Sequence, residues 1–354
     1  YLSIATQMAQ QSPLSKSLRL QNTDANPLTI ADGFNAPANT TANTFAVDPK
    51  LRLGYLHIWQ ISIQRDLPFA MQVILAYQGT RGRHALQQFL PNTYPLGAVS
   101  PCPSCPGGFV YMTSDGTSNR EAGTIQIRRR LRSGFSATLD YTYSKSIDDA
   151  APGGNQTTAV FTAQDWLNPG AERALSSFDQ RHQLGSSFQY TSGMGMAGGT
   201  LLKGWKGALL KQWTLSGQIN AASGYPLTPI FPAAVSGTGV TGPLRPDLTG
   251  ADIEAAPQGL HVNPAAFTAP EAGHWGNAAR NSVPGPSQFG LNASLARTFR
   301  TGDRTSLDLR VDANNVLNHV TFPSWNTTVG SAQFGLPVTA NAMRNVRTTV
   351  RWRF

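Results

Sequence analysis

One stretch with the spacing of a cofactor-binding motif is Gly193–Gly198, which matches the pattern G-x-G-x-x-G. A dinucleotide-binding turn of this kind needs a helix after it and an acidic residue about 20 positions further on. Here Gly199–Trp205 follows, and neither Asp nor Glu occurs again before Asp247. We therefore interpret the motif as a flexible turn and expect no cofactor.

The two cysteines, Cys102 and Cys105, lie in the sequence Cys-Pro-Ser-Cys. Zinc sites usually combine two such pairs or add histidines, and the sequence around this pair offers neither. A small loop disulfide, formed in an oxidising compartment, is the favoured interpretation. Free or metal-binding thiols are the alternatives.

Two sets of acidic residues have the types needed for acid–base or metal chemistry: the pair Asp148 and Asp149, and Asp179 with His182. Such sets often arise by chance, so exposed loops are the favoured explanation. The sequence contains neither a Gly-x-Ser-x-Gly elbow nor a His-Glu-x-x-His run. We expect no enzyme, no catalytic residue and no metal site.

Composition excludes further classes of protein. Charged residues make up 13% of the 354 residues, about half the roughly 25% usual in soluble domains. Hydrophobic residues make up 40%, which is too many for a disordered charged tail. No segment approaches the roughly 18 uninterrupted apolar residues of a transmembrane helix, although this test does not detect alternating strands.

The net charge of +9 invites a nucleic-acid interpretation, which would require the basic residues to gather in a patch or stripe. Instead they are scattered through predicted turns and along one face of predicted strands. The one dense cluster is Arg128–Arg130 with Arg132, next to a predicted turn. We expect no nucleic-acid partner.

The elements that position these residues are strands, because apolar residues recur at every second position. The clearest case is Asn345–Phe354, where valines, Trp352 and Phe354 alternate with Arg347, Arg351 and Arg353. Eight further segments show the same period: Trp59–Gln64, Met71–Gln78, Thr124–Arg130, Ala137–Ser144, His182–Tyr190, Trp213–Asn220, Phe289–Ala296 and Leu307–Asn314. We predict nine strands and no helix of ten or more residues.

The connections between these strands alternate in length. Tight turns are predicted at Arg65–Pro68, Leu131–Gly134 and Arg300–Asp303. Long loops are predicted at Gly79–Gly123, Lys145–Arg181, Ser223–Gly285 and Asn318–Asn341, and Thr191–Gly207 is an exception of medium length. In an up-and-down sheet this alternation puts short turns at one end and long loops at the other, which is typical of an outer-membrane β-barrel.

In such a barrel the apolar face meets lipid and the polar face lines a wet lumen. The last two strands then give six lumen-facing candidates: Arg347, Arg351, Arg353, Asp308, Arg310 and Asp312. The arginines either attract anionic solutes or pair with carboxylates of neighbouring strands, Asp140 included; pairing is favoured. The alternative architecture is a half-buried sheet in a secreted or surface-exposed structural or adhesive β-protein.

Four stretches carry a resemblance to a known family. They are Phe178–Leu184, Ser223–Pro229, Asn263–Pro270 followed by Trp275–Asn281, and Val311–His319. In this order and spacing they resemble the C-terminal barrel region of TonB-dependent outer-membrane receptors. The nearest group is the Oar-like set with a carboxypeptidase-regulatory-like domain, which is abundant in Acidobacteria.

The resemblance implies non-catalytic uptake of an unidentified substrate across the bacterial outer membrane, through a 22-stranded antiparallel up-and-down barrel with long extracellular loops. It implies a plug and a TonB box, which are not in this sequence, so the TonB complex would be contacted by a missing N-terminal part. We expect residues 1–50 to be the tail of an extracellular loop and residues 51–354 to be the C-terminal part of the barrel. Outer-membrane lipid and lipopolysaccharide are further expected partners.

The resemblance also assigns a role to the last residues of the chain. In outer-membrane barrels the terminal aromatic is a signal for the barrel assembly machinery, which here points to Trp352 and Phe354. The last strand then ends at the periplasmic side, and all four long loops lie outside the cell.

Overall fold

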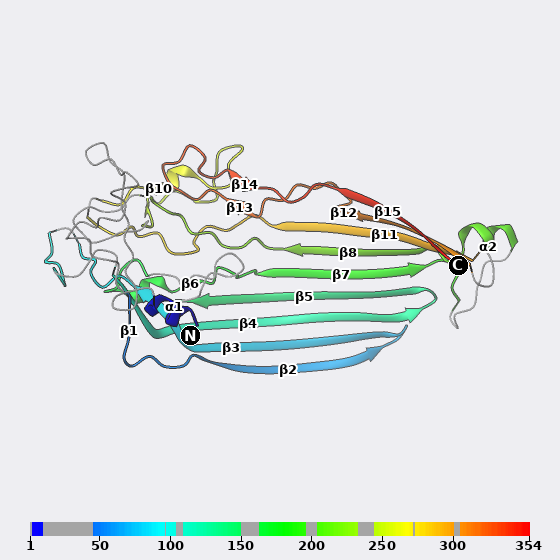
Figure 1. The fold of residues 1–354 in the computed structure, drawn as a ribbon, viewed down its shortest axis with the longest axis horizontal. Helices are drawn as coiled ribbons and strands as arrows, with labels where there is room; N and C mark the ends of the chain where they lie inside the picture. The colour runs from blue at the N-terminus through cyan, green and yellow to red at the C-terminus, as the bar shows by residue number, and fades with distance from the viewer. Residues whose placement is uncertain are drawn as a thin grey trace, which may run out of the picture.

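The structure is a computed structural model that describes residues 2–9, 45–95, 97–103, 109–149, 163–195, 204–232, 244–271, 273–300 and 305–354. Its main element is one antiparallel sheet in which the strands follow the path β15-β12-β11-β8-β7-β5-β4-β3-β2 (Figure 1). These nine strands are β2 (Tyr55–Leu67), β3 (Met71–Phe89), β4 (Val110–Arg132), β5 (Phe135–Asp148), β7 (His182–Thr191), β8 (Thr214–Ala222), β11 (Gln288–Arg300), β12 (Ser306–Asn314) and β15 (Asn345–Arg353). They correspond to the nine predicted segments, so the predicted all-β, up-and-down fold is confirmed.

The remaining elements are short. Two small strands join the sheet, and the others lie in the connections between strands or at the chain start: α1 (Leu2–Ala9), β1 (Phe45–Val47), η1 (Pro169–Glu172), β6 (Ala174–Leu175), α2 (Gly204–Leu210), β9 (Asp247–Leu248), η2 (Pro264–Ala266), β10 (Phe267–Thr268), β13 (Ser324–Trp325) and β14 (Pro337–Thr339). β1 pairs with β4 and β6 pairs with β5. No helix in the described part of the chain is long and apolar enough to cross a membrane.

The alternation of connection lengths is visible in space. The short connections, together with α2 and the C-terminus, lie at one end of the sheet, and the long connections lie at the other (Figure 1). The tight turns use left-handed backbone: Phe69 and Ala70 join β2 to β3, and Ser133 and Gly134 join β4 to β5. At Gly134 a Cβ atom would lie 2.2 Å from the carbonyl oxygen of Thr191, so only glycine fits there.

One predicted loop is much shorter than expected. Gly79–Gly123 was predicted as a connection, but β3 continues to Phe89 and β4 begins at Val110. The two strands therefore extend as a paired ribbon beyond the rest of the sheet at the long-loop end. In this ribbon polar and apolar residues do not alternate, because neither face is buried in an apolar phase. The two-residue period therefore did not reveal these extensions of β3 and β4.

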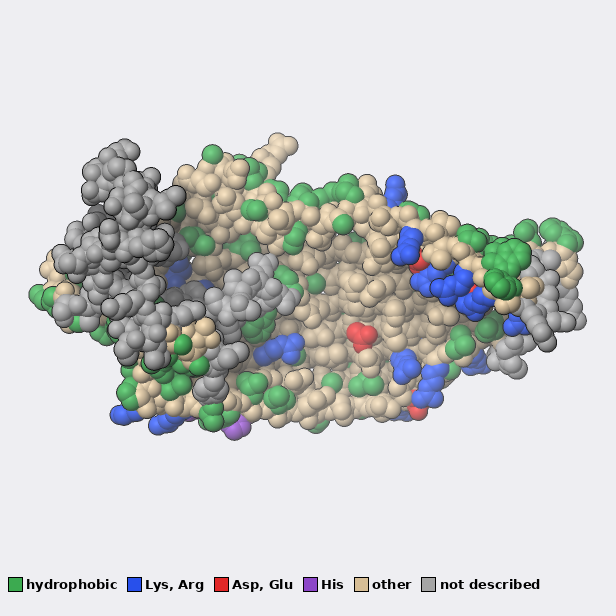
Figure 2. Space-filling view, in the orientation of Figure 1, with side chains coloured by type: hydrophobic (Ala, Val, Ile, Leu, Met, Phe, Trp, Pro, Cys, Tyr) green, Lys and Arg blue, Asp and Glu red, His purple; other side chains and the backbone are tan. Residues whose placement is uncertain are grey.

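Register keeps most of the polar residues of the nine strands on one face. For example, Thr142 of β5 lies opposite Thr124 of β4 and Gln183 of β7. Figure 2 shows this face, where mostly uncharged atoms surround one acidic side chain in the middle of the sheet and Lys and Arg gather toward the short-turn end.

The opposite, apolar face is open. Val350 is 63% exposed and Trp352 is 61% exposed, and Ile61, Leu75 and Leu295 are exposed as well. The hydrophobic core of the described chain lies in the long connections instead: Val262, Ala266, Phe267, Ala278, Val283 and Phe334. A soluble sandwich would cover the apolar face with a second layer, whereas a membrane sheet leaves it to lipid.

Candidate functional site: the polar wall and the long-loop end

The polar face is a wall on which several pairs of side chains are hydrogen-bonded between neighbouring strands. Gln126 donates to Asp140 across β4 and β5, and the hydroxyls of Thr138 and Ser187 lie 2.6 Å apart across β5 and β7. Such pairs hold the side chains in the plane of the wall and leave them in contact with water.

Near the long-loop end the wall has a hollow of about 450 Å³. Its floor is the row Gly185, Asn220 and Gly290, which lie opposite one another on β7, β8 and β11. The missing side chains of the glycines make the hollow, because a Cβ at Gly290 would meet no atom within 4 Å. Residues of the rim and roof are polar amides and a hydroxyl: Gln180, Gln183, Gln288, Thr321 and Asn341.

Within the described ranges no charged residue lines this hollow, which we call the amide hollow. The side-chain amide N–H of Gln183 donates to the side-chain amide oxygen of Gln180 at 2.8 Å, which fixes that part of the rim. Among the described residues, the side chains of Asn220 and Gln288 have no hydrogen-bond partner. They are therefore available to a ligand, and uncharged amides suit neutral hydroxyl or amide groups.

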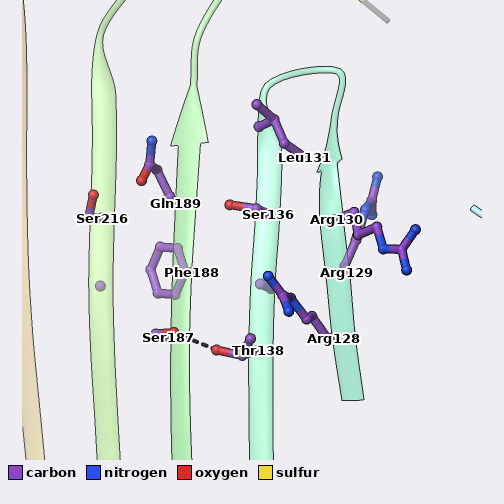
Figure 3. Close-up of a pocket in the computed structure, with 12 residues that line it drawn as sticks. Arg128, Arg129, Arg130, Leu131, Ser136, Thr138, Ser187, Phe188, Gln189 and Ser216 are labelled. Carbon is purple, nitrogen blue, oxygen red and sulfur yellow. Dashed lines mark hydrogen bonds between the residues drawn. The ribbon is translucent and has the colours of Figure 1, made fainter. Parts of the chain in front are cut away.

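Toward the short-turn end the wall becomes basic. A second hollow of about 510 Å³ lies over the ends of β4, β5, β7 and β8 and is lined by Arg128, Ser136, Thr138 and Gln189 among others. Figure 3 shows Arg128 extending from β4 over β5. The neighbouring Arg129 lies over the ring of Phe135 with 4.9 Å between guanidinium carbon and centroid. The cluster predicted to abut a turn therefore does so, at the end of β4.

The six predicted lumen residues all lie on the polar face of β12 and β15, in one neighbourhood. Arg353 pairs with Asp308 at 2.9 Å, and Arg310 pairs with Asp312 at 2.8 Å on the same strand. Asp308 also accepts a hydrogen bond of 2.7 Å from Thr298. These pairs are largely exposed, so they position side chains more than they stabilise the fold.

Arg347 and Arg351 lie opposite Asp312 and Asp308 in the register. Those carboxylates are engaged by Arg310 and Arg353, and within the described residues neither Arg347 nor Arg351 forms a salt bridge. A third hollow, of about 390 Å³, is lined by Arg351 and Arg353 with Asp308 and Arg310. This end of the wall thus carries excess positive charge.

The long connections are held together by two buried ion pairs. Arg245 donates from Nη1 to both carboxylate oxygens of Glu172, at 3.0 and 2.8 Å. Arg280 contacts the Asp148 carboxylate and also donates to the backbone carbonyl of Glu172. The Arg245–Glu172 pair joins the β8–β11 connection to the connection that follows β5. The Arg280–Asp148 pair joins the β8–β11 connection to the end of β5 itself.

Gln164 completes this network. Its backbone N–H donates to Glu172 at 2.9 Å, and its side chain accepts from the backbone N–H of Arg245 and donates to the carbonyl of Gly276. Trp275 donates its indole N–H to the carbonyl of Gln164 at 2.6 Å. The two connections therefore form one folded cap beside the amide hollow.

Sequence reasoning missed Glu172, Arg245, Arg280 and Gln164. It also favoured exposed loops for Asp148 and Asp179, which is wrong, since they are 1% and 5% exposed. Asp179 accepts a hydrogen bond of 2.6 Å from the backbone N–H of Ser146. No local signal marks these residues, because the partners are distant in sequence.

An aromatic cluster joins the β3–β4 ribbon to the cap. Phe89 lies 5.3 Å from Tyr111 and stacks on Trp166 at 6.3 Å, measured between ring centroids. Burial, aided by the carboxylates of Asp48 and Asp115, raises the pKa of Tyr111. Its hydroxyl therefore stays protonated, as a neutral donor, at physiological pH.

The other predicted residues lie at opposite ends of the molecule. Cys102 takes part in a disulfide in the β3–β4 connection, whereas Cys105 lies outside the described residues. Trp352 and Phe354 lie at the short-turn end, and Phe354 is 97% exposed. In the described part of the chain no three His, Cys, Asp or Glu side chains gather as metal ligands would.

Comparison with known proteins agrees with this architecture. The outer membrane transporter YddB from Escherichia coli matches with a TM-score of 0.50 and 10% identity, over 89% of this chain and 34% of that one. FpvA of P. aeruginosa, solved with heterologous pyoverdines, matches with a TM-score of 0.41 and 13% identity, over 86% and 28%. The chain thus spans about a third of the length of these structures. No curated protein matches it.

A match to a family covers more of the chain than either of these structures does. Residues 2–347 match the family described as outer membrane beta barrel domain, which is nearly the whole chain. The open apolar face and the polar wall are the two surfaces that such a barrel needs. The chain therefore belongs to the outer membrane beta-barrel domain family and is a protein of the bacterial outer membrane.

Proposed function

We propose that the chain forms part of the barrel of an outer-membrane receptor that takes up its substrate in a TonB-dependent, non-catalytic way. The observation that carries the proposal is the order of features along one continuous polar face. A folded cap stands beside an uncharged amide hollow at the long-loop end, and a basic wall follows toward the short turns. This order suits capture of a neutral, hydrogen-bonding part of the substrate before passage inward.

The rest of the barrel, the plug and the TonB box would be supplied outside this chain, as in the Oar-like receptors that it resembles. Two observations support this. β2 and β15 form the two edges of the strand path, and strand edges in lipid need partners. In addition, α1 lies at the long-loop end, where the tail of an extracellular loop belongs (Figure 1). A secreted adhesive protein is disfavoured by the open apolar face.

The test is an uptake experiment in the native bacterium. Cells with and without the gene are given a mixture of neutral oligosaccharides and peptides, and depletion from the medium is followed by mass spectrometry. We expect depletion of at least one compound to require the gene and to stop when a protonophore collapses the proton gradient. Gene-dependent depletion that continues with the protonophore would contradict TonB dependence.

A further inference from the structure

One connection at the short-turn end differs from its neighbours. The β2–β3 and β4–β5 connections are tight turns, whereas the β7–β8 connection contains the seven-residue helix α2. α2 lies just beyond the end of the sheet (Figure 1). Three of its large apolar side chains are mostly exposed: Trp205 is 73% exposed, Leu209 60% and Leu210 51%.

The C-terminal end of α2 is fixed to the sheet. The carbonyl of Leu210 accepts a hydrogen bond from the hydroxyl of Ser192, and the carbonyl of Leu209 accepts one of 3.0 Å from the indole N–H of Trp213. Ser192 directly follows β7, and Trp213 directly precedes β8. Both ends of the connection therefore hold the last turn of the helix in place.

Arg297 determines on which side of the sheet this helix end lies. It is opposite Leu309 in the register, so it belongs to the apolar face, yet it is only 7% exposed. Its guanidinium lies over the rings of Phe299 and Trp213, at 4.4 and 5.5 Å, and donates to the carbonyl of Leu209. A charge on a lipid-facing surface is costly unless it is shielded, and the aromatic faces and a helix C-terminus both stabilise a cation.

We propose that α2 is an interfacial anchor that lies in the headgroup region of the inner leaflet, with Trp205, Leu209 and Leu210 in contact with phospholipid. The exposed side chains continue the open apolar face, because Arg297 and Trp213 tie the helix end to that face. The helix lies beyond the strand ends, and the headgroup layer occupies the several ångströms next to the hydrocarbon core. Tryptophan prefers this layer, and Lys211, which directly follows the helix, is a residue that anionic headgroups favour.

The test places an environment-sensitive label on the helix. The Leu209→Cys variant of the intact protein is labelled with NBD and reconstituted in vesicles of phosphatidylethanolamine and phosphatidylglycerol. The vesicles contain lipids that carry a nitroxide at the headgroup, at acyl carbon 5 or at acyl carbon 12, and quenching of the NBD fluorescence by each lipid is measured. Ile61→Cys on the lipid-facing part of β2 is the deep control, and Val99→Cys, 87% exposed in a long connection, is the aqueous control. Trp205→Cys provides a second label site if Leu209→Cys does not assemble.

We expect the Leu209 label to be quenched at least twofold more by the headgroup and carbon-5 nitroxides than by the carbon-12 nitroxide. The Ile61 label should show the opposite order, and the Val99 label should not be quenched. A Leu209 label that behaves like the Val99 label overturns the proposal. A blue-shifted label that no lipid quenches also overturns it, because the helix would then be covered by a protein partner.

A second measurement tests the role of Arg297. Arg297→Leu should lower the lipid quenching of the Leu209 label at least twofold, while Arg297→Lys should keep more than half of it. Only variants that retain the heat-modifiable mobility of a folded barrel are compared. Unchanged quenching in Arg297→Leu would overturn the assignment of Arg297 as the residue that holds the helix at the membrane.

Discussion

Arg245 and Glu172 form a two-pronged ion pair with both side chains almost completely withdrawn from water, although 73 positions separate them in the sequence. The pair joins two long connections that would otherwise be independent loops. A buried pair of this kind contributes little net stability compared with an apolar pair, but it is costly to break, because the remaining charge stays buried.

Arg245→Met should therefore open the cap without unfolding the sheet. Leaving the Glu172 carboxylate buried and unpaired costs about 3 kcal/mol or more, which raises the population of the opened cap on the order of 100-fold. The measurement is the rate of proteinase K cleavage in the long connections, on intact cells or on protein in detergent. The matched double variant Glu172→Leu with Arg245→Met should recover much of the resistance, and equal rates in the single variant and the wild type would contradict the prediction.

The pair Arg353–Asp308 should behave differently. Here the arginine side chain is 62% exposed, so water screens the attraction and replaces the lost contact. We expect Arg353→Ala to change the free energy of unfolding by less than about 1 kcal/mol, measured by guanidinium unfolding in detergent. Arg280→Ala, which breaks the buried contact with Asp148, is the comparison and should be clearly less stable. A larger loss in Arg353→Ala than in Arg280→Ala would refute this ranking.

Periodicity predicted the sheet because each strand has to satisfy two different environments, lipid and water, at alternate positions. It failed toward the long-loop end of β3 and β4, where residues such as Arg81, Arg83 and Asn119 remove the pattern. The short connections were predictable from turn chemistry, as at Ser133–Gly134. The helix in the β7–β8 connection was not predicted, because tertiary contacts from Ser192 and Arg297 hold it rather than its own length.

Only the part of the site that lies on the strands was predictable, because it follows from the alternation of polar and apolar residues. Because successive side chains of a strand point to opposite faces, sequence position alone places Arg353, Arg310 and their aspartates on the polar wall. The cap and the amide hollow depend on contacts between residues far apart in the sequence, such as Arg280 with Asp148, 132 positions away. A single sequence carries no signal for such pairs, and glycines that form a hollow resemble glycines that form a turn.

Filling the amide hollow should block uptake without harming the barrel. A Cβ at Gly290 meets nothing within 4 Å, so Gly290→Phe can project into the hollow above Asn220. We expect at least a tenfold loss in the rate of gene-dependent substrate depletion, because the bulky ring excludes a ligand from the floor of the hollow. Protein level and heat-modifiable mobility should stay unchanged.

The control for this variant is Gly123→Phe. Gly123 also has open space around its Cβ position, but it lies opposite Tyr77 and Tyr143 on the apolar face. The same added ring should therefore meet lipid and leave uptake unchanged. Equal uptake in both variants would show that the hollow is not on the substrate path, while equal loss would point to a general folding defect.

The exposed C-terminal aromatic should matter for assembly and not for stability. Phe354 is 97% exposed, so its replacement by Ser removes almost no packing from the fold, and unfolding in detergent should change by less than about 0.5 kcal/mol. If the residue is read by the barrel assembly machinery, Phe354→Ser should nevertheless lower the amount of folded protein in the outer-membrane fraction several-fold, as measured by immunoblot with heat modification. Met343→Ser, which removes a 53% exposed apolar side chain just before β15, is the control and should assemble normally. Wild-type levels of folded Phe354→Ser protein in the outer membrane would rule out this role, since the loss of an assembly signal has to reduce insertion even when the finished barrel is equally stable.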